Sequence, residues 1–384
     1  MQKKFLILIF LLLCFYLYFK DEVFKEKTII VGTSAPISGT ISSWGKAVTY
    51  GVNSYFKYVN DNNLLGDKKI EFLIYDDKYE PELTLENTKK LIYEDKVFTL
   101  FGFVGTPTVK RILPILYDEN MPFFGSFSGA SFLRNNKNEN IINFRSSYNQ
   151  EIETLINYIQ KEKKLDKIAI FYQNDDYGED VYISLLDLIK KRDLKLVAEG
   201  SYKRNTLSIN HAFNEIKDAQ PEVIFMFGAY KTNALFIKKA KENEKLKNVI
   251  FCNISFGDAN SMVKELKILD SNTTNLIFSQ IVPSYLNTNI PSVLEYQTLM
   301  KKYYPEEELG FLSFEAFLSS KVLVNALQKI KNEITKEKFL NALKTTDKNL
   351  LEGIPLEFNN SQLLNKIYLF EYINNDFKEI YNEK

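Results

Sequence analysis

Strand-like and helix-like segments alternate along most of this chain, and that alternation is the strongest constraint on its fold. The first unit is a β-branched run at residues 28–31, stopped by Gly32 and followed by small polar residues and an amphipathic stretch to about Asn60. The same order recurs over residues 69–144 and again over residues 147–258. Repeated strand–helix units indicate parallel sheets covered by helices. The sequence therefore predicts an α/β fold built from two such series.

The C-terminal part of the chain adds helices and a hairpin to these series. Helices are predicted at about 291–304, 311–330 and 335–345, and the tail from Ile367 to Tyr381 reads as a β-hairpin turning at residues 374–376. Hydroxyl side chains are expected to cap several helix N-termini. The expected caps are Ser42 or Ser43, Ser147 and Thr335.

Length and charge limit the classes of protein that fit. A chain of 384 residues is long enough for two domains with full cores. Lys+Arg and Asp+Glu both number 49, so no net charge favours a nucleic-acid partner. The only cysteines are Cys14 and Cys252, and Cys14 lies in the N-terminal apolar run. The folded body is therefore expected to have no intrachain disulfide.

The N-terminus has the pattern of an export signal. Two lysines, Lys3 and Lys4, precede an uninterrupted apolar run from Phe5 to Phe19, and Lys20 closes it. No small-residue cleavage site follows, which favours an uncleaved membrane anchor over a cleaved signal peptide. Either way, the chain from about residue 26 onward is predicted to lie outside the cytoplasmic membrane.

The motifs of common enzymes and cofactor sites are missing. No dinucleotide or triphosphate fingerprint follows a strand, and the single histidine, His211, reads as a surface residue. Paired carboxylates at Asp76-Asp77 and Asp175-Asp176 stand at strand ends, where capping and turn roles are expected. A hydrolase using them is a remote alternative. The sequence predicts no enzyme, no cofactor and no metal.

Hydroxyl and aromatic side chains recur where the predicted strands end. In open α/β sheets, ligands bind in the crevice outside the carboxyl ends of the strands. A set of hydroxyls with a few rings suits a small polar ligand held by hydrogen bonds and ring contacts. The set comprises Ser38, Trp44, Thr106, Ser128, Tyr177, Tyr230 and Ser255.

Five short motifs, in order, give the chain a family resemblance. They are residues 32–39 with Trp44-Gly45, residues 75–77 with Pro81 beyond, and residues 105–108, 127–130 and 176–178. With them the chain resembles the periplasmic solute-binding proteins of the leucine/isoleucine/valine-binding type, the type I periplasmic-binding fold of ABC transporter substrate-binding proteins. The resemblance covers nearly everything after the N-terminal apolar run.

The resemblance implies two Rossmann-like lobes joined by three hinge crossovers. Lobe I would contain residues 28–144 and 284–357, and lobe II residues 145–283 and 358–384, with residues 1–27 as the signal or anchor and linker. The ligand would sit between the lobes, which close on it by hinge motion.

The resemblance also assigns roles to residues of lobe I. Thr106 and the backbone at Ser128 and Gly129, in one motif with Phe127, would bind a carboxylate-like group of the ligand. Trp44 would form a wall of the pocket.

Lobe II departs from the family pattern at one position. Tyr177 and Tyr230 would reach across as the lobes close, but Ser255 stands where amino-acid binders carry an acidic partner for the ligand's ammonium. A buried ammonium without a carboxylate is costly. Either Asp258, three residues on, turns into the site, or the ligand is an uncharged amide, a small carboxylate or an aromatic acid.

The function implied is that of an extracytoplasmic, periplasmic receptor. It would close on an amino acid, amide or small carboxylate and deliver it to an ABC permease, without catalysis. The alternative is a membrane-tethered sensor that signals through a separate partner such as a kinase or cyclase. Both place the chain at the inner membrane through residues 5–19, with no nucleic-acid partner.

Overall fold

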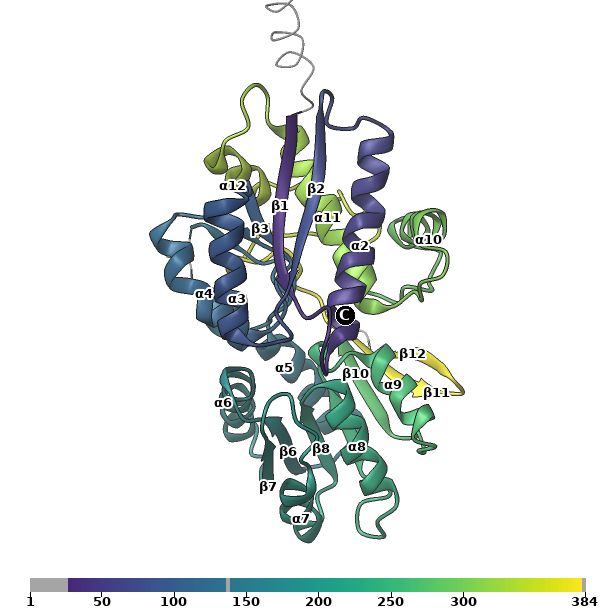
Figure 1. The fold of residues 1–384 in the computed structure, drawn as a ribbon. Helices are drawn as coiled ribbons and strands as arrows, with labels where there is room; N and C mark the ends of the chain where they lie inside the picture. Colours follow the sequence, from purple (N-terminus) through teal and green to yellow (C-terminus); the bar gives the residue numbers. More distant parts are fainter. Residues whose placement is uncertain (1–26, 136–138, 382–384) are drawn as a thin grey trace, which may run out of the picture.

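The computed structural model describes residues 27–135 and 139–381, and the predicted export signal or anchor lies outside these residues. The described chain forms two bodies, each built on its own sheet and placed one above the other in Figure 1. Helices cover both sheets, which confirms the predicted α/β class. None of the described helices combines the length and the apolar character needed to cross a membrane.

The upper body, called lobe I here, is organised around a five-stranded parallel sheet of order β2-β1-β3-β4-β5. Helix α11, from the C-terminal part of the chain, packs along the N-terminal helix α2, so distant parts of the chain share one lobe. The strands are β1 (Lys27–Ala35), β2 (Lys68–Asp76), β3 (Thr99–Phe101), β4 (Phe123–Phe124) and β5 (Ile141–Ile142). The helices are α2 (Ser42–Asp61), α3 (Pro81–Lys89) continued by η1 (Lys90–Glu94), α4 (Thr106–Asp118), η2 (Ser131–Leu133), α10 (Pro291–Tyr303), α11 (Phe311–Lys329) and α12 (Lys336–Lys344).

The lower body, lobe II, holds a seven-stranded sheet of order β12-β11-β10-β9-β8-β6-β7. It is parallel from β7 to β10, and the C-terminal hairpin β11–β12 extends it antiparallel. The strands are β6 (Lys167–Gln173), β7 (Lys195–Tyr202), β8 (Val223–Phe227), β9 (Ile250–Asn253), β10 (Leu276–Gln280), β11 (Tyr368–Ile373) and β12 (Asp376–Tyr381). The helices are α5 (Tyr148–Tyr158) continued by η3 (Ile159–Lys163), α6 (Asp176–Lys191), α7 (Asn210–Ala219), α8 (Tyr230–Lys241), η4 (Ser255–Gly257) and α9 (Ala259–Ile268).

Strand β10 was not predicted from the sequence. All five of its residues are buried, and it lies between β9 and β11 in the middle of the sheet. A strand that is buried on both faces shows no alternation of apolar and polar residues, so periodicity does not reveal it.

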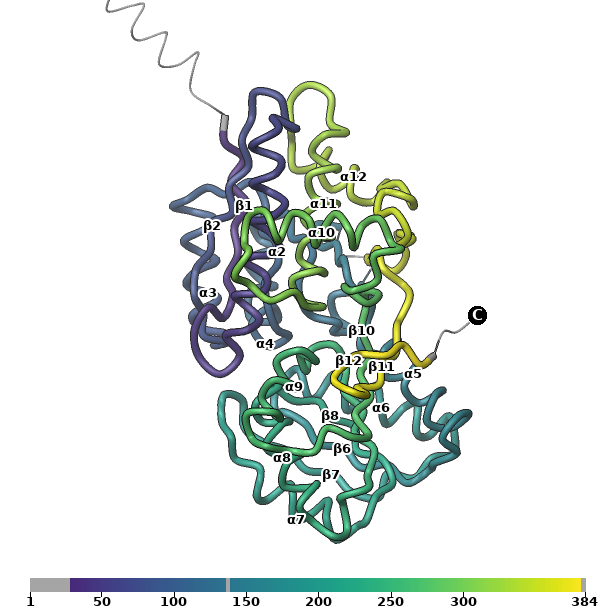
Figure 2. Tube along the Cα trace, turned by 90° about the vertical axis from the view of Figure 1, so that its right-hand side faces the viewer, coloured from purple at the N-terminus to yellow at the C-terminus, as the bar shows by residue number. Residues whose placement is uncertain are grey.

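The chain passes between the lobes three times: after β5, after β10 and before β11. The first and third passages run side by side, because the amide of Leu364 donates to the carbonyl of Phe144 at 2.9 Å. The hydroxyl of Ser146 donates to the carbonyl of Leu364 at 3.0 Å. Figure 2 shows the yellow C-terminal segment descending from α12 into the hairpin of lobe II.

Two of the predicted helix caps are confirmed and one is wrong. Ser147 and Thr335 accept hydrogen bonds from the amides of Gln150 and Lys338 at the starts of α5 and α12. The cap residue of α2 is instead Ile41, without a side-chain bond. Ser43 does not cap α2, because its hydroxyl donates to Asp258 of lobe II.

The start of α2 lies unusually close to the loop that follows β1. A Cβ on Gly45 would stand 2.3 Å from the carbonyl oxygen of Pro36 and 2.8 Å from the amide nitrogen of Ile37. Both are backbone atoms that no side-chain rotation moves away. A glycine at this position therefore allows α2 to place Trp44 at the interface of the lobes.

We expect Gly45→Ala to lower the free energy of unfolding by about 1–3 kcal/mol, the usual cost of overpacking. Alanine elsewhere in a helix is more favourable than glycine by about 1 kcal/mol, so the sign of the change is diagnostic. Urea denaturation followed by circular dichroism measures it. Lys46→Ala, at the exposed next residue, is the control. A stabilised Gly45→Ala variant would contradict the close approach.

Candidate functional site

Aromatic rings from both lobes meet between the two sheets. Trp44 at the start of α2 stacks on Phe256 of lobe II with ring centroids 5.0 Å apart, and meets Phe127 of lobe I edge-on at 5.7 Å. Phe256 in turn contacts Tyr177 of α6 at 4.7 Å, and Tyr177 contacts Tyr148 of α5 at 5.4 Å. All five rings are buried. We call them the interlobe aromatic cluster.

Three buried hydroxyls lie beside this cluster. The Oγ1 of Thr106 is 2.8 Å from the Oγ of Ser128 and 3.4 Å from the Oη of Tyr148. Thr106 is the first residue of α4, and Ser128 follows β4, so both stand at carboxyl ends of the lobe I sheet. A Cβ on Gly129 would lie 2.7 Å from the backbone nitrogen of Tyr148. Glycine there lets the start of α5 approach the two hydroxyls.

A buried ion pair lies against the cluster on its hinge side. The Nε and Nη2 atoms of Arg145 donate to the two carboxylate oxygens of Glu315 on α11 at 2.9 and 3.0 Å. The guanidinium carbon lies 5.8 Å from the ring centre of Trp44. Burial opposes the charge of Arg145, but the nearby Glu315 carboxylate raises the pKa of Arg145 above its usual range. The ion pair joins the first crossover to α11.

Ser255 is bound to a second buried carboxylate. Glu151 of α5 accepts from the amide of Ser255 at 2.7 Å, from its hydroxyl at 2.9 Å, and from Ser279 at 2.6 Å. The Ser255 hydroxyl also accepts from Arg145 at 3.0 Å. Burial raises the pKa of Glu151. Where the resemblance places an acidic residue, this chain has a serine bound to a glutamate from another element.

Asp258 lies at the mouth of the cleft between the lobes. It is 2% exposed and accepts from the Ser43 hydroxyl across the lobe boundary at 2.7 Å, and from the amide of Ser261 in α9 at 3.1 Å. Burial raises the pKa of Asp258. Asp258 and Tyr230 line a cavity of about 500 Å³ that is open to solvent and is lined by residues of both lobes. The Asp258 carboxylate is held by Ser43 and Ser261, so the turn toward the cluster considered from the sequence is not seen.

Most of the predicted site residues lie together, and one does not. Ser38 is exposed and its hydroxyl donates to Asp76 at 2.6 Å, so it belongs to the loop after β1 and not to the cluster. Five residues lie in the aromatic cluster or beside it: Trp44, Thr106, Phe127, Ser128 and Tyr177. Gly129 packs on Tyr148, Ser255 binds Glu151, and Tyr230 and Asp258 stand at the mouth.

Sequence reasoning missed the other members of the site. These are Arg145, Tyr148, Glu151, Phe256 and Glu315. The short polar run Arg145-Ser146-Ser147 is a usable signal in the sequence for Arg145 and for the start of α5. No spacing connects Arg145 to Glu315, because 170 positions separate them in the sequence.

The paired carboxylates after β2 hold the loop that leads into α2. Asp76 accepts from the amides of Ile37 and Lys78 at 2.9 and 3.0 Å. Asp77 is fully buried and accepts from the hydroxyls of Ser34 at 2.8 Å and Thr84 at 3.1 Å. These contacts fit the turn roles expected of the pair. Burial raises the pKa of Asp77 to about 6.

The raised pKa of Asp77 predicts a pH dependence of stability. The folded state holds the Asp77 proton more tightly than the unfolded chain, whose pKa is near 3.8. The contribution of the protonated Asp77 to the free energy of unfolding is therefore complete below about pH 4. It is lost as the pH rises through about 6. A shift of about two units corresponds to about 3 kcal/mol.

We expect Asp77→Asn to flatten the fall in the free energy of unfolding between about pH 4 and pH 6. Urea denaturation at several pH values measures this. Asp76→Asn is the matched control: hydrogen bonds from Ser38, Lys78 and Ile37 outweigh burial and lower the pKa of Asp76, so this carboxyl does not titrate in that window. An Asp77→Asn variant with the full wild-type slope would contradict the assignment.

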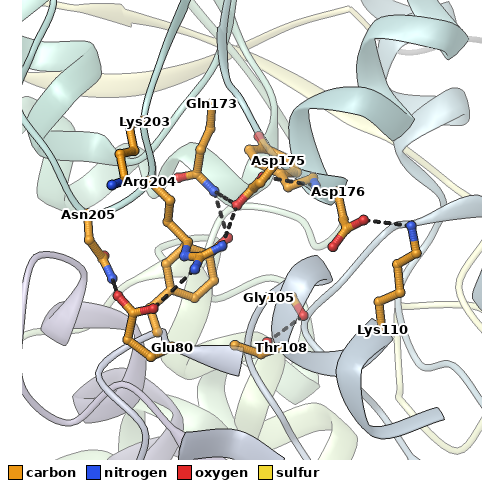
Figure 3. Close-up of polar contacts among 12 residues, drawn as sticks. Glu80, Gly105, Thr108, Lys110, Gln173, Asp175, Asp176, Lys203, Arg204 and Asn205 are labelled. Carbon is orange, nitrogen blue, oxygen red and sulfur yellow. Dashed lines mark hydrogen bonds and ion pairs between the residues drawn. The ribbon is translucent and has the colours of Figure 1, made fainter. Parts of the chain in front are cut away.

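Polar contacts join the two lobes at the outer edge of the cleft (Figure 3). Arg204, after β7, donates to Glu80 of lobe I and to Asp175 of lobe II, both at 3.1 Å. Lys110 of α4 pairs with Asp176 of α6 at 2.6 Å. Lys264 of α9 pairs with Glu308 of lobe I at 2.8 Å. These ion pairs and the interlobe aromatic cluster both join lobe I to lobe II, so the lobes are in a closed arrangement.

The outer contacts predict how closure responds to mutation. Partly exposed ion pairs contribute about 0.2–1 kcal/mol, so we expect Arg204→Gln to shift the ratio of open to closed chains by up to about fivefold. Small-angle X-ray scattering should show a larger radius of gyration. Lys195→Gln removes a surface pair with Asp166 inside lobe II and should leave the radius unchanged. Equal radii of gyration for both variants would contradict a contribution of Arg204 to the closed arrangement of the lobes.

Comparisons with known proteins agree with this architecture. A family model described as periplasmic binding protein matches residues 28–376. Leu/Ile/Val-binding protein homolog 7 of Brucella abortus is 20% identical over 313 residues, covering 79% of this chain and 77% of the relative. The crystal structure of a possible leucine/isoleucine/valine-binding protein from Rhodopirellula baltica superposes with a TM-score of 0.86 and 29% identity, covering 93% of this chain and 97% of that one.

Two further solved structures contain ligands and show the same fold. One is a branched-chain amino acid transporter substrate binding protein from Streptococcus pneumoniae in complex with isoleucine, with a TM-score of 0.79, 15% identity, and coverage of 92% and 98%. The other is an ABC transporter solute binding protein from R. palustris in complex with benzoate, with a TM-score of 0.80, 17% identity, and coverage of 92% and 95%.

Proposed function

The chain belongs to the periplasmic binding protein family, and from this premise we propose that it is a receptor that closes its lobes on a small polar ligand and delivers it to an ABC-type transporter. The resemblance inferred from the five sequence motifs is confirmed at the level of the family. The members are solute-binding receptors of the space outside the cytoplasmic membrane. The ligand classes we propose are an amino acid, an amide or a small carboxylate.

The interlobe aromatic cluster with its three hydroxyls is the observation that carries the proposal. Thr106, Ser128 and Tyr148 are fully buried, and the Thr106 hydroxyl lies 2.8 Å from that of Ser128 and 3.4 Å from that of Tyr148. Closure removes these groups from water, which is costly unless hydrogen bonds replace the lost ones. A ligand that completes those bonds favours the closed state over the open one.

The proposed binding residues extend across the lobe boundary. In lobe I we assign the carboxylate-like group of the ligand to Thr106, Ser128 and the backbone at Gly129, with Trp44 and Phe127 as walls. In lobe II we assign contacts to Tyr177 and Ser255, with Tyr230 and Asp258 at the mouth. Isoleucine and benzoate, the ligands of two structural neighbours, both join a carboxylate to an apolar body, which supports this assignment. We retain 28–144 with 284–357, and 145–283 with 358–384, as the proposed lobe boundaries.

A membrane-tethered sensor is the second candidate. The observation that favours it is the apolar run at residues 5–19 without a small-residue cleavage site, which lies outside the described residues. In both candidates the chain binds its ligand without converting it. A permease that is stimulated by the liganded chain in vesicles supports transport, whereas ligand-dependent binding to a kinase or cyclase supports sensing.

We expect a ligand of this chain to raise the melting temperature by mass action, by the equivalent of about 2.7 kcal/mol at a hundred times its Kd. Trp44 is the only tryptophan and is 1% exposed, so the same ligand should change its fluorescence. A thermal-shift screen of amino acids, amides and carboxylates with parallel emission spectra tests both. A ligand that stabilises the chain but leaves the Trp44 emission unchanged would place the site elsewhere, and consumption of the compound would contradict a receptor.

A further inference from the structure

Two polar atoms beside the interlobe aromatic cluster lack a hydrogen-bond partner among the described residues. They are Nη1 of Arg145 and Oη of Tyr177, and both side chains are completely buried. A buried polar group left without a partner destabilises the fold, and a charged group does so more strongly. Buried groups of this kind in a native structure call for a partner that the chain itself does not supply.

Both atoms belong to side chains of the proposed binding site. The other two nitrogens of the Arg145 guanidinium bind Glu315, and the guanidinium faces the ring of Trp44. The ring of Tyr177 lies against those of Tyr148 and Phe256. The two unpartnered atoms therefore belong to side chains that contact the aromatic rings proposed to bind the ligand.

The carboxylates around the site are, in contrast, already supplied with donors. Glu151 accepts three hydrogen bonds and Glu315 accepts two from Arg145. Asp258 accepts from Ser43 and Ser261. A guanidinium N–H can only donate, so what the site lacks is an acceptor. An ammonium group would bring three further donors into a site whose acceptors are engaged.

The charges of the site do not oppose an anion. The buried Arg145 and the partly buried Arg134 balance the charges of the buried Glu151 and Glu315. A monoanion therefore enters a site without net charge from these four groups, where it gains charge-assisted hydrogen bonds. Such bonds are about twice as strong as those between neutral groups.

We propose that the ligand is a monocarboxylate with an apolar or aromatic body and no ammonium group, whose oxygens accept from Nη1 of Arg145 and Oη of Tyr177. The body of the ligand would contact Trp44 and Phe256. This inference rests on the proposed receptor function and narrows its ligand class. It explains why Ser255, bound to Glu151, stands where an amino-acid binder would present a free acid.

Compounds that differ only in the ammonium group test the proposal. We would titrate the purified full chain with 4-methylpentanoate and leucine, which share a carbon skeleton, with benzoate, and with 4-methylpentanamide, using isothermal calorimetry. We expect 4-methylpentanoate or benzoate to bind at least about tenfold more tightly than leucine, because leucine must bury an ammonium group for which the site has no free acceptor.

A conservative variant tests the named atoms. Tyr177→Phe keeps the ring and removes Oη, and should weaken carboxylate binding about tenfold or more, with a smaller loss for 4-methylpentanamide. Tyr182→Phe is the matched control, since the Tyr182 hydroxyl binds Glu199 within lobe II and belongs to no proposed contact. Circular dichroism and the melting temperature verify that both variants fold.

The outcomes separate this inference from the proposed function. Tight binding of leucine with no binding of the carboxylates overturns the inference and leaves the receptor function in place. Carboxylate binding that Tyr177→Phe leaves unchanged also overturns it. If the wider screen of amino acids, amides and carboxylates yields no ligand at all, the proposed function fails together with the inference.

Discussion

The arrangement of the lobes depends on one buried ion pair, that of Arg145 with Glu315. Arg145 stands at the first crossover, Glu315 on α11 of lobe I, and Ser255 of lobe II joins the pair through its hydroxyl. A buried charge that loses its partner costs about 3–5 kcal/mol. The crossover is thus fixed to lobe I, and through Ser255 it is in contact with the loop of lobe II that carries Phe256 of the interlobe aromatic cluster.

The two edges of the cleft differ in their physical character. At the hinge edge the contacts are buried and bidentate, as in Arg145 with Glu315. At the outer edge they are partly exposed single ion pairs such as Lys110 with Asp176 and Lys264 with Glu308. Exposed pairs contribute little and exchange readily with water. The lobes can therefore separate at the outer edge while the hinge edge stays formed, which is the motion that a two-lobed receptor requires.

Much of this organisation was accessible from the sequence. The alternation of segments predicted parallel sheets, and the carboxyl ends of parallel strands converge, so Thr106 and Ser128 could be expected together. Trp44 and Tyr177 follow from the same rule. What failed depended on tertiary neighbours. Ser38 was attributed to the site, but Asp76 draws its hydroxyl into the loop after β1, and no local pattern distinguishes these outcomes.

Among the groups of the candidate site, those that depend on tertiary contacts were the least predictable. Glu151 sits on a helix whose pattern indicates only packing, and Phe256 occupies a short 3₁₀ turn without periodicity. The role of Phe256 depends on Trp44 of the opposite lobe. The role of Glu151 depends on hydrogen bonds from Ser255 and Ser279, which lie in the same lobe but more than a hundred residues away in the sequence. Ser255 departs from the residue type that the resemblance implies at this position, and its amide and hydroxyl are bound to Glu151.

The central claim is that the two lobes close over a small solute. The distance between spin labels on α4 and α6 tests it most directly, with cysteines introduced at the exposed positions Tyr117 and Ile183. Double electron–electron resonance should give a broad, longer distribution for the chain alone and one narrow, short distance with saturating ligand. Identical distributions with and without a ligand that demonstrably binds would contradict the account.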